Sequence, residues 1–179
     1  MDSIDWGKDG IHQAPPTSYR PAALTTRDPP ARQPDAFPVL IVDDDDAIRD
    51  TLATLLEDAG YATSVAATGR EALATLRAAP TPMVVLLDLI MPEPDGRSVL
   101  RAVTAEQRLA RRHAFIIVTA ASEALLNQTQ TEVSRLDMGL TLDTVRKPFD
   151  IDAVVAAVAR IEQRLRVIHH ARSTSRAPL

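Results

Sequence analysis

The residues of this sequence that are best suited to chemistry are three acids, a hydroxyl and an amine. They are Asp43, Asp44, Asp88, Thr119 and Lys147. Carboxylates that converge repel one another unless a proton or a cation neutralises them, and oxygen ligands without Cys or His favour a hard ion such as Mg²⁺. A carboxylate beside that ion can attack phosphorus and form an aspartyl-phosphate. The set therefore indicates metal-assisted phosphoryl transfer, with Asp88 as the acceptor and with Thr119 and Lys147 holding phosphoryl oxygens.

Asp88 follows the apolar run Met83–Leu87, whose pattern is typical of a strand buried on both faces. Pro92, Pro94 and the pair Asp95-Gly96 come soon after it, so the chain must leave the strand through a tight loop. Open α/β sheets collect ligands at such strand ends. This segment alone leaves a second interpretation open, in which Asp88 caps the helix that follows.

Alternating strands and helices must position these residues. Apolar runs predict strands over 39–42, 61–66, 83–87, 114–118 and 142–146, and helical spacing predicts helices over about 46–59, 69–78, 97–112, 122–136 and 151–165. This alternation is typical of a parallel sheet whose strands all end at one edge, which would then hold all five residues. Asp45 or Asp46 is expected to cap the first helix. The basic cluster that ends the third helix, including His113, is expected to be a solvated terminus.

Length and composition bound the possible functions. The chain of 179 residues suits one domain with tails, and residues 1–37, which hold six of the thirteen prolines, predict a disordered extension. We expect the folded domain over 38–168 and a flexible tail over 169–179. The net charge of -4 gives no basis for nucleic-acid binding, the lack of Cys excludes disulfides and thiolate sites, and no apolar run could span a membrane. These features predict a soluble cytoplasmic protein.

From Val39 to about Val167 the chain resembles a bacterial response-regulator receiver domain. Four motifs in order carry the resemblance: an acid pair after the first strand, an aspartate before Met-Pro and Asp-Gly, a threonine before small residues, and a lysine before proline. They are Val42-Asp43-Asp44, Asp88 with Met91-Pro92 and Asp95-Gly96, Thr119 with Ala120-Ala121, and Lys147-Pro148. The resemblance implies a flavodoxin-like, doubly wound α/β fold, (βα)5, with a five-stranded parallel sheet in strand order 2-1-3-4-5.

The resemblance also implies a Mg²⁺ ion and a phosphorylated aspartate. The expected metal ligands are Asp43, Asp44, Asp88 and the backbone carbonyl of Ile90. A histidine kinase or a histidine phosphotransfer protein would phosphorylate Asp88, and Thr119 and Lys147 would bind the phosphate. The peptide bond between Lys147 and Pro148 is expected to be cis. The chain would be a switch of a two-component system or phosphorelay and not an enzyme.

A stand-alone, single-domain regulator that acts through protein contacts is the role that the resemblance suggests. The exposed side of the first helix around Ile48, with the loop after Lys147, would dock the phosphodonor. The helix predicted over 122–136, the fifth strand and the last helix would form the output face or a homodimer interface. Neither a nucleic acid nor a membrane is expected as a partner.

Two features depart from the family pattern. Thr144 stands three residues before Lys147, where the family usually has Tyr or Phe, so an aromatic rotamer switch at that position is excluded. The segment between Thr119 and Lys147 is several residues longer than usual. The enlarged part is the region through which the family generally signals.

Two other functions fit parts of the sequence. Asp43-Asp44-Asp45 matches the Asp-x-Asp of a haloacid-dehalogenase-like phosphatase, with Asp43 as nucleophile and Asp45 as acid. That family prefers Thr or Val where this chain has Ala47, and it leaves Asp88 without a role. The other alternative is a phosphorylation-independent scaffold of the same fold, which Thr144 and the long segment keep open.

Overall fold

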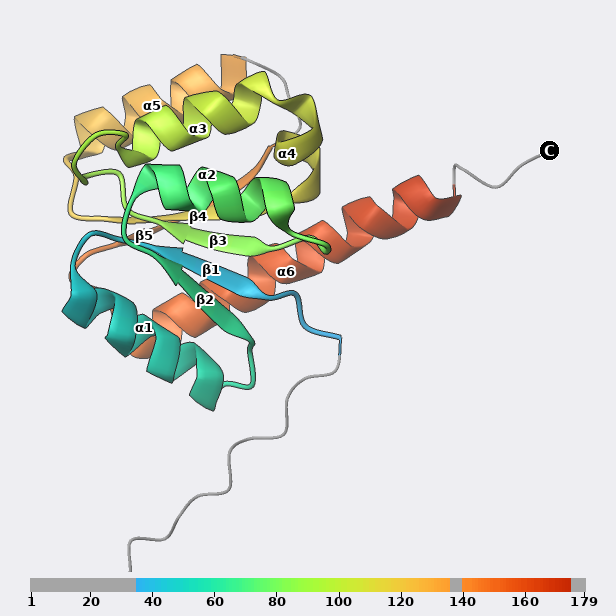
Figure 1. Ribbon diagram of the computed structural model, residues 1–179, viewed down its shortest axis with the longest axis horizontal. Coiled ribbons are helices and arrows are strands. Elements are labelled where there is room, and N and C mark those ends of the chain that lie inside the picture. Colours follow the sequence, from blue (N-terminus) through green and yellow to red (C-terminus); the bar gives the residue numbers. More distant parts are fainter. Residues whose placement is uncertain (1–34, 136–139, 175–179) are drawn as a thin grey trace, which may run out of the picture.

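Five parallel strands form the centre of the molecule in the computed structural model, which describes residues 35–135 and 140–174 (Figure 1). The strands are β1 (Val39–Val42), β2 (Thr63–Ala66), β3 (Val84–Leu87), β4 (Ala114–Thr119) and β5 (Thr141–Arg146). Their order in the sheet is β2-β1-β3-β4-β5. The predicted flavodoxin-like sheet and its strand order are confirmed.

Side chains of the strands alternate between two hydrophobic cores, one on each face of the sheet. Leu40, Val85, Phe115 and Ile117 lie in the first core, and Ile41, Leu86, Ile116 and Val118 lie in the second. Both faces of β1, β3 and β4 are therefore buried. Burial on both faces explains why these strands read in the sequence as unbroken apolar runs.

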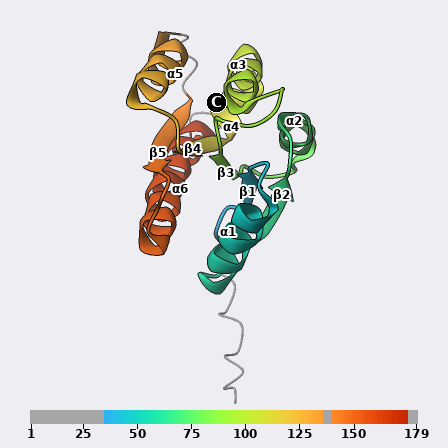
Figure 2. The same ribbon diagram turned by 90° about the vertical axis from the view of Figure 1, so that its left-hand side faces the viewer.

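Helices cover both faces of the sheet. The helices α1 (Asp46–Asp58) and α6 (Ile151–Thr174) pack on one face. The other face is covered by α2 (Gly69–Ala78), α3 (Gly96–Ala105), α4 (Gln107–Arg112) and α5 (Glu123–Arg135). Figures 1 and 2 show the three layers, with the sheet between the two groups of helices.

Side-chain caps begin the helices that follow β1 and β3. Asp45 caps α1 by accepting hydrogen bonds from the backbone N–H groups of Ala47 and Ile48. Asp95 caps α3 by accepting one from Ser98 at 2.7 Å. Asp88 is therefore not the cap of the helix that follows it.

The helix predicted from Gly96 to the basic cluster is two helices, because the chain breaks at Glu106 with φ of -100° and ψ of 85°. A straight helix turns about 100° per residue, so it would carry Leu109 to the side opposite Leu100. The break turns the second helix so that both leucines are buried in the same core. Arg77 of α2 holds Glu106 at the break with a hydrogen bond of 3.0 Å.

His113 is buried at the start of β4, not solvated with the rest of the basic cluster. Its Nδ1 accepts a hydrogen bond from the backbone N–H of Met83 at 3.2 Å. Burial lowers the pKa of His113 to about 4, and the charge of Arg112 adds to this shift. The imidazole therefore stays neutral at ordinary pH.

The last helix is longer than the sequence predicted, since α6 runs to Thr174 instead of ending near Leu165. Its Glu162 is buried and accepts hydrogen bonds from the backbone N–H of Phe37 at 3.2 Å and from the hydroxyl of Tyr61 at 3.3 Å. Of the predicted extension over 1–37, residues 1–34 lie outside the described part, as do residues 175–179 of the predicted tail. No helix within the described ranges is long and apolar enough to cross a membrane.

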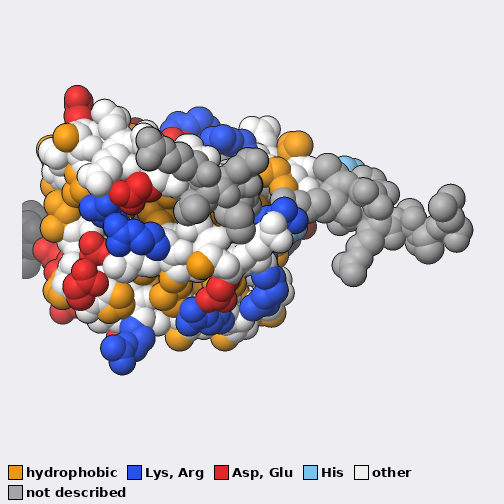
Figure 3. All heavy atoms as spheres, turned by 90° about the horizontal axis from the view of Figure 1, so that it is seen from above, with side chains coloured by type: hydrophobic (Ala, Val, Ile, Leu, Met, Phe, Trp, Pro, Cys, Tyr) orange, Lys and Arg blue, Asp and Glu red, His pale blue; other side chains and the backbone are white. Residues whose placement is uncertain are grey.

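Charges of both signs are mixed over α3 and α5. Figure 3 looks onto this side and shows basic and acidic side chains next to one another. Glu132 of α5 pairs with Arg97 at 2.8 Å and with Arg101 at 3.7 Å. In the described part of this side, charges of the two signs are therefore interspersed.

Candidate functional site

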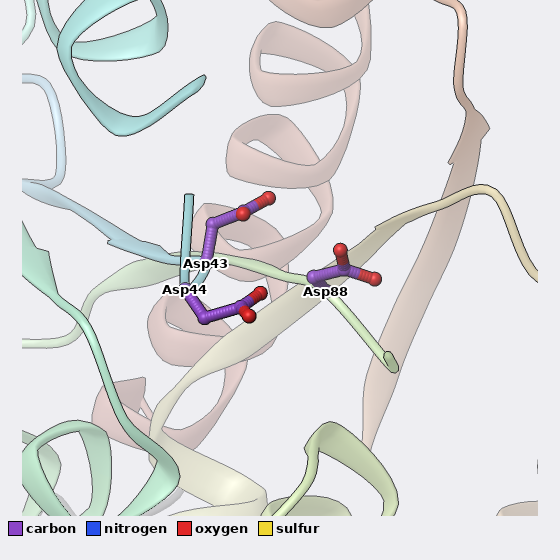
Figure 4. Close-up of side chains that lie close together, drawn as sticks. All are labelled: Asp43, Asp44 and Asp88. Atoms are coloured by element: carbon purple, nitrogen blue, oxygen red, sulfur yellow. The ribbon is translucent and has the colours of Figure 1, made fainter. Parts of the chain in front are cut away.

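Three carboxylates meet at the carboxyl edge of the sheet. The register pairs Val42 with Leu87, so the next residues, Asp43 and Asp88, lie side by side. Oxygen atoms of Asp43, Asp44 and Asp88 all lie within 4.8 Å of one another. Figure 4 shows the first two at the end of β1 and Asp88 at the end of β3.

Lys147 joins the two buried acids. Its Nζ donates to Asp43 Oδ2 at 2.6 Å and to Asp88 Oδ2 at 2.7 Å. Burial lowers the pKa of the Lys147 amine, but the hydrogen bonds and charges of the two acids outweigh burial and hold that pKa above its ordinary value. The lysine is therefore charged and neutralises part of the acidic cluster. The bond to Pro148 is cis, as predicted.

The second carboxylate oxygen of each buried acid accepts a hydrogen bond from the loop that follows that acid. Asp43 Oδ1 accepts from the backbone N–H of Asp45 at 3.0 Å, and Asp88 Oδ1 accepts from that of Ile90 at 3.0 Å. Asp43 is 2% exposed and Asp88 is 6% exposed. These bonds fix the side-chain rotamers, so the carboxylates are oriented before any ligand binds.

Two glycines allow the loops at this edge to pack closely. A Cβ atom on Gly96 would lie 2.0 Å from the carbonyl oxygen of Asp88, and one on Gly69 would lie 2.2 Å from that of Pro94. Only glycine permits such approaches without a shift of the backbone. The start of α3 thus packs directly on the end of β3. The start of α2 packs on the loop that connects β3 to α3.

Thr119 lies at the same edge, and its described hydrogen bonds go to residues other than the three acids. It is fully buried, and its Oγ1 accepts a hydrogen bond from the backbone N–H of Ala121 at 3.2 Å. Its carbonyl accepts from the backbone N–H of Lys147 at 3.0 Å. The predicted role of Thr119 in binding phosphate, and that of the Ile90 carbonyl in binding metal, stay predictions.

Sequence reasoning missed Arg49, which lies behind the acid pair. This arginine of α1 is buried, and its Nη1 donates to the backbone carbonyl of Asp43 at 2.5 Å. Its Nη2 donates to the carboxylate of Asp46. The signal in the sequence was the spacing of three residues between Asp46 and Arg49, which places the pair on one side of a helix.

Thr144, at the position where the family usually has an aromatic residue, lies in β5 and faces α5. Its Oγ1 accepts a hydrogen bond from Gln130 Nε2 at 3.2 Å. Part of the long segment before β5, residues 136–139, lies outside the described residues. The hydrogen bond between Gln130 and Thr144 therefore joins α5 to β5 in the described part of the enlarged region.

The chemistry of the donors suits a hard divalent cation. The acidic pocket contains only oxygen ligands, and Asp44 is exposed, so positions remain for water and a phosphoryl oxygen. Asp45 is occupied as the cap of α1, which argues against its role as the acid of a phosphatase. The pocket can hold a metal against Asp88.

Comparisons with known proteins identify relatives of the whole domain. Residues 39–159 match the model described as the response regulator receiver domain. Regulatory protein AtoC of Escherichia coli (strain K12) is 37% identical over 143 residues, which cover 76% of this chain and 29% of that protein. A solved structure of a response regulator receiver domain protein (CheY-like) from Methanospirillum hungatei JF-1 has a TM-score of 0.59 and 30% identity, covering 72% of this chain and 95% of that one.

The curated relatives are much longer than the matched region. The DNA-binding transcriptional regulator NtrC of Salmonella typhimurium (strain LT2) is 38% identical over 125 residues, which cover 68% of this chain but 24% of that protein. The chain thus spans less than a third of the length of these two relatives. Because one of them is named for DNA binding, the expectation that this chain has no nucleic-acid partner is unsupported.

Proposed function

The chain belongs to the response regulator receiver domain family, and we propose that it is a signalling switch controlled by phosphorylation of Asp88. The observation that carries the proposal is the bridge from Lys147 to Asp43 and Asp88 beside the third carboxylate, Asp44. A histidine kinase or a histidine phosphotransfer protein is the proposed donor. The protein is a phosphoryl acceptor and not a catalyst with turnover.

The proposed reaction is an in-line transfer from a phosphohistidine. A carboxylate oxygen of Asp88 attacks phosphorus, a P–O bond forms as the P–N bond breaks, and the leaving imidazole nitrogen takes a proton from solvent. We assign Mg²⁺ to Asp43, Asp44 and Asp88, with the Ile90 carbonyl as a further ligand. When bound, the ion neutralises charge on the transferred phosphoryl group.

Charge is the proposed cause of the switch. A phosphoryl group adds close to two negative charges and strong acceptors beside Lys147. The lysine can then exchange its bond to Asp88 for phosphoryl oxygens, and Thr119 can turn its hydroxyl toward them. Both residues lie next to loops that lead to α5 and α6, so a movement here reaches the surface.

A groove beside this edge suits the phosphodonor. It runs between α1 and α6 and is lined by the apolar side chains of Leu55, Ile151 and Val155 and by the acids Asp50 and Asp152. Ile151 is 54% exposed at the loop that follows Lys147. We propose that the donor docks here.

Output is proposed to pass through α5, β5 and α6, as a protein interface or a homodimer contact. A second groove on this side is lined by Thr144, Arg146, Phe149 and Arg160. Arg160 pairs with Asp143 of β5 at 3.2 Å. Stand-alone action in the cytoplasm is part of the proposal, whereas AtoC and NtrC extend well beyond the region that this chain matches.

Labelling by a small phosphodonor tests the acceptor. The protein incubated with radiolabelled acetyl phosphate and Mg²⁺ should form an acid-stable, base-labile acyl phosphate, and Asp88→Ala should form none. Asp35→Asn, at the opposite end of the sheet, is the control and should label as the wild type does. Equal labelling of Asp88→Ala would refute the assignment.

A further inference from the structure

Arg49 is a buried cation whose only described partners lie at the acid cluster. Its side chain is 10% exposed, and its two hydrogen bonds go to the Asp43 carbonyl and the Asp46 carboxylate. A buried guanidinium is costly unless its donors are paired, so these two contacts determine where Arg49 lies. They fix the turn from β1 into α1.

The four consecutive aspartates, Asp43 to Asp46, have different contacts. Asp45 caps α1, and Asp46 is paired with Arg49, although Asp46 itself is 87% exposed. Neither belongs to the group of described carboxylates whose oxygens lie within 4.8 Å of one another at this edge. Asp43 and Asp44 are left as the pair that can share a cation with it.

The bond to the Asp43 carbonyl also fixes the peptide unit between the two ligands. That carbonyl belongs to the peptide that joins Asp43 to Asp44, so its rotation would swing the Asp44 side chain. Asp44 is exposed, and no hydrogen bond between its carboxylate and another described residue orients it. The guanidinium of Arg49, together with the Asp45 N–H that donates to Asp43 Oδ1, therefore sets the direction of the Asp44 backbone.

We infer that Arg49 is a positioning residue for the metal site: its guanidinium, anchored by the Asp46 carboxylate, holds the Asp43–Asp44 peptide. The inference rests on the proposed Mg²⁺-dependent phosphorylation. Lysine cannot replace arginine in this role, because a single ammonium lacks the planar fork that reaches both partners. Arg49→Lys therefore keeps the positive charge of this side chain and removes its planar set of donors.

The experiment measures Mg²⁺ affinity by calorimetry and, separately, the rate of labelling by acetyl phosphate as Mg²⁺ is raised. Arg49→Lys should weaken Mg²⁺ binding roughly tenfold, the loss typical when a residue that orients metal ligands is changed. The labelling rate at saturating Mg²⁺ should equal that of the wild type, which a general folding defect would not allow. Arg70→Lys, an exposed charge-preserving change at the start of α2, is the matched control.

A second variant keeps the inference testable if Arg49→Lys does not fold. Asp46→Asn weakens the hold on the guanidinium, because an amide oxygen is a weaker acceptor than a carboxylate, and should weaken Mg²⁺ binding about threefold, the scale of an exposed ion pair. Glu123→Gln removes one exposed charge at the same edge of the sheet and should change the affinity less. If Arg49→Lys folds and binds Mg²⁺ with wild-type affinity, the inference is overturned and the proposed function stands. If Arg49→Lys does not fold, wild-type affinity in Asp46→Asn has the same meaning. A wild-type protein that binds no Mg²⁺ overturns the proposed function as well as the inference.

Discussion

Lys147 and the acids that it bridges illustrate how single side chains are held ready at this site. Asp43 and Asp88 are buried, so each charge would be costly without a partner. The lysine supplies that partner, and its own raised pKa reflects the same contacts. A phosphoryl group at Asp88 would compete for the same amine. Lys147 thus stabilises the unphosphorylated form and is also the residue proposed to bind the phosphoryl group.

Replacing Lys147 by alanine should separate metal binding from the response. Mg²⁺ binding should persist, because the three carboxylates remain and a competing cation is gone. Beryllofluoride, which mimics the acyl phosphate, should no longer shift the NMR signals of α5 and β5. Unchanged shifts in Lys147→Ala would remove this residue from the mechanism.

His113 should make stability depend on pH at the other end of the sheet. Its pKa is about 4 when folded against an ordinary value of 6.5, so below pH 6.5 the unfolded chain takes up a proton that the folded one does not. Stability should therefore fall as pH falls from about 6.5 toward 4, by about 2 kcal/mol between about pH 7 and pH 5. Urea unfolding at the two pH values measures this loss.

Substitution of the imidazole provides the comparison. His113→Asn keeps an acceptor for the Met83 N–H and should lose most of the dependence between these pH values. His170→Asn, at an exposed position, should keep it. An equal pH dependence in His113→Asn and the wild type would contradict the assignment.

At the scale of elements, α6 is tied to the segment before β1. Besides the bond from its N–H to Glu162, the ring of Phe37 lies 5.5 Å from the Arg166 guanidinium carbon and 6.2 Å from the His169 ring. His169 also donates to the carbonyl of Arg112 at the end of α4 at 3.2 Å. The distal turns of α6 are therefore part of the packed domain.

Phe37→Ala should loosen those turns. The loss of apolar area and of the cation–π contact should cost about 1–2 kcal/mol, and amide hydrogen exchange should rise in α6 after Glu162 more than in β3. Val167→Ala, which trims a side chain that is 66% exposed on the same helix, is the control. If amide exchange in α6 after Glu162 rises no more than in β3 in Phe37→Ala, as in the control, Phe37 does not hold the distal turns of α6.

For the whole molecule, the two cores hold the sheet rigid while its carboxyl edge keeps like charges together. A cation that binds this edge only in the folded state should stabilise the entire domain. At a Mg²⁺ concentration ten times its dissociation constant, the gain should be about 1.4 kcal/mol, observed as a rise in melting temperature. Asp44→Asn should lose most of this gain, which is measured for each protein as the difference in melting temperature with and without Mg²⁺. An equal gain in Asp44→Asn would exclude Asp44 as a ligand.

The sequence by itself determined the features that local pattern encodes. Apolar runs gave the strands, caps and spacing gave most helices, and the alternation of the two gave the parallel sheet whose edge collects Asp43, Asp88 and Lys147. Each of these follows from residues near one another in the chain, or from the rule that parallel strands end at one edge.

Only the tertiary structure decided what depends on distant neighbours. The break at Glu106 follows from packing of Leu109 into the core, and the burial of His113 follows from its bond to Met83. The pair of Asp46 with Arg49 and the cap by Asp95 are contacts between near neighbours, but more than one acid stood at a suitable spacing for each, and the structure selected between them. Periodicity reports which side of an element is apolar, whereas burial and pairing of a polar group depend on what the fold brings against it.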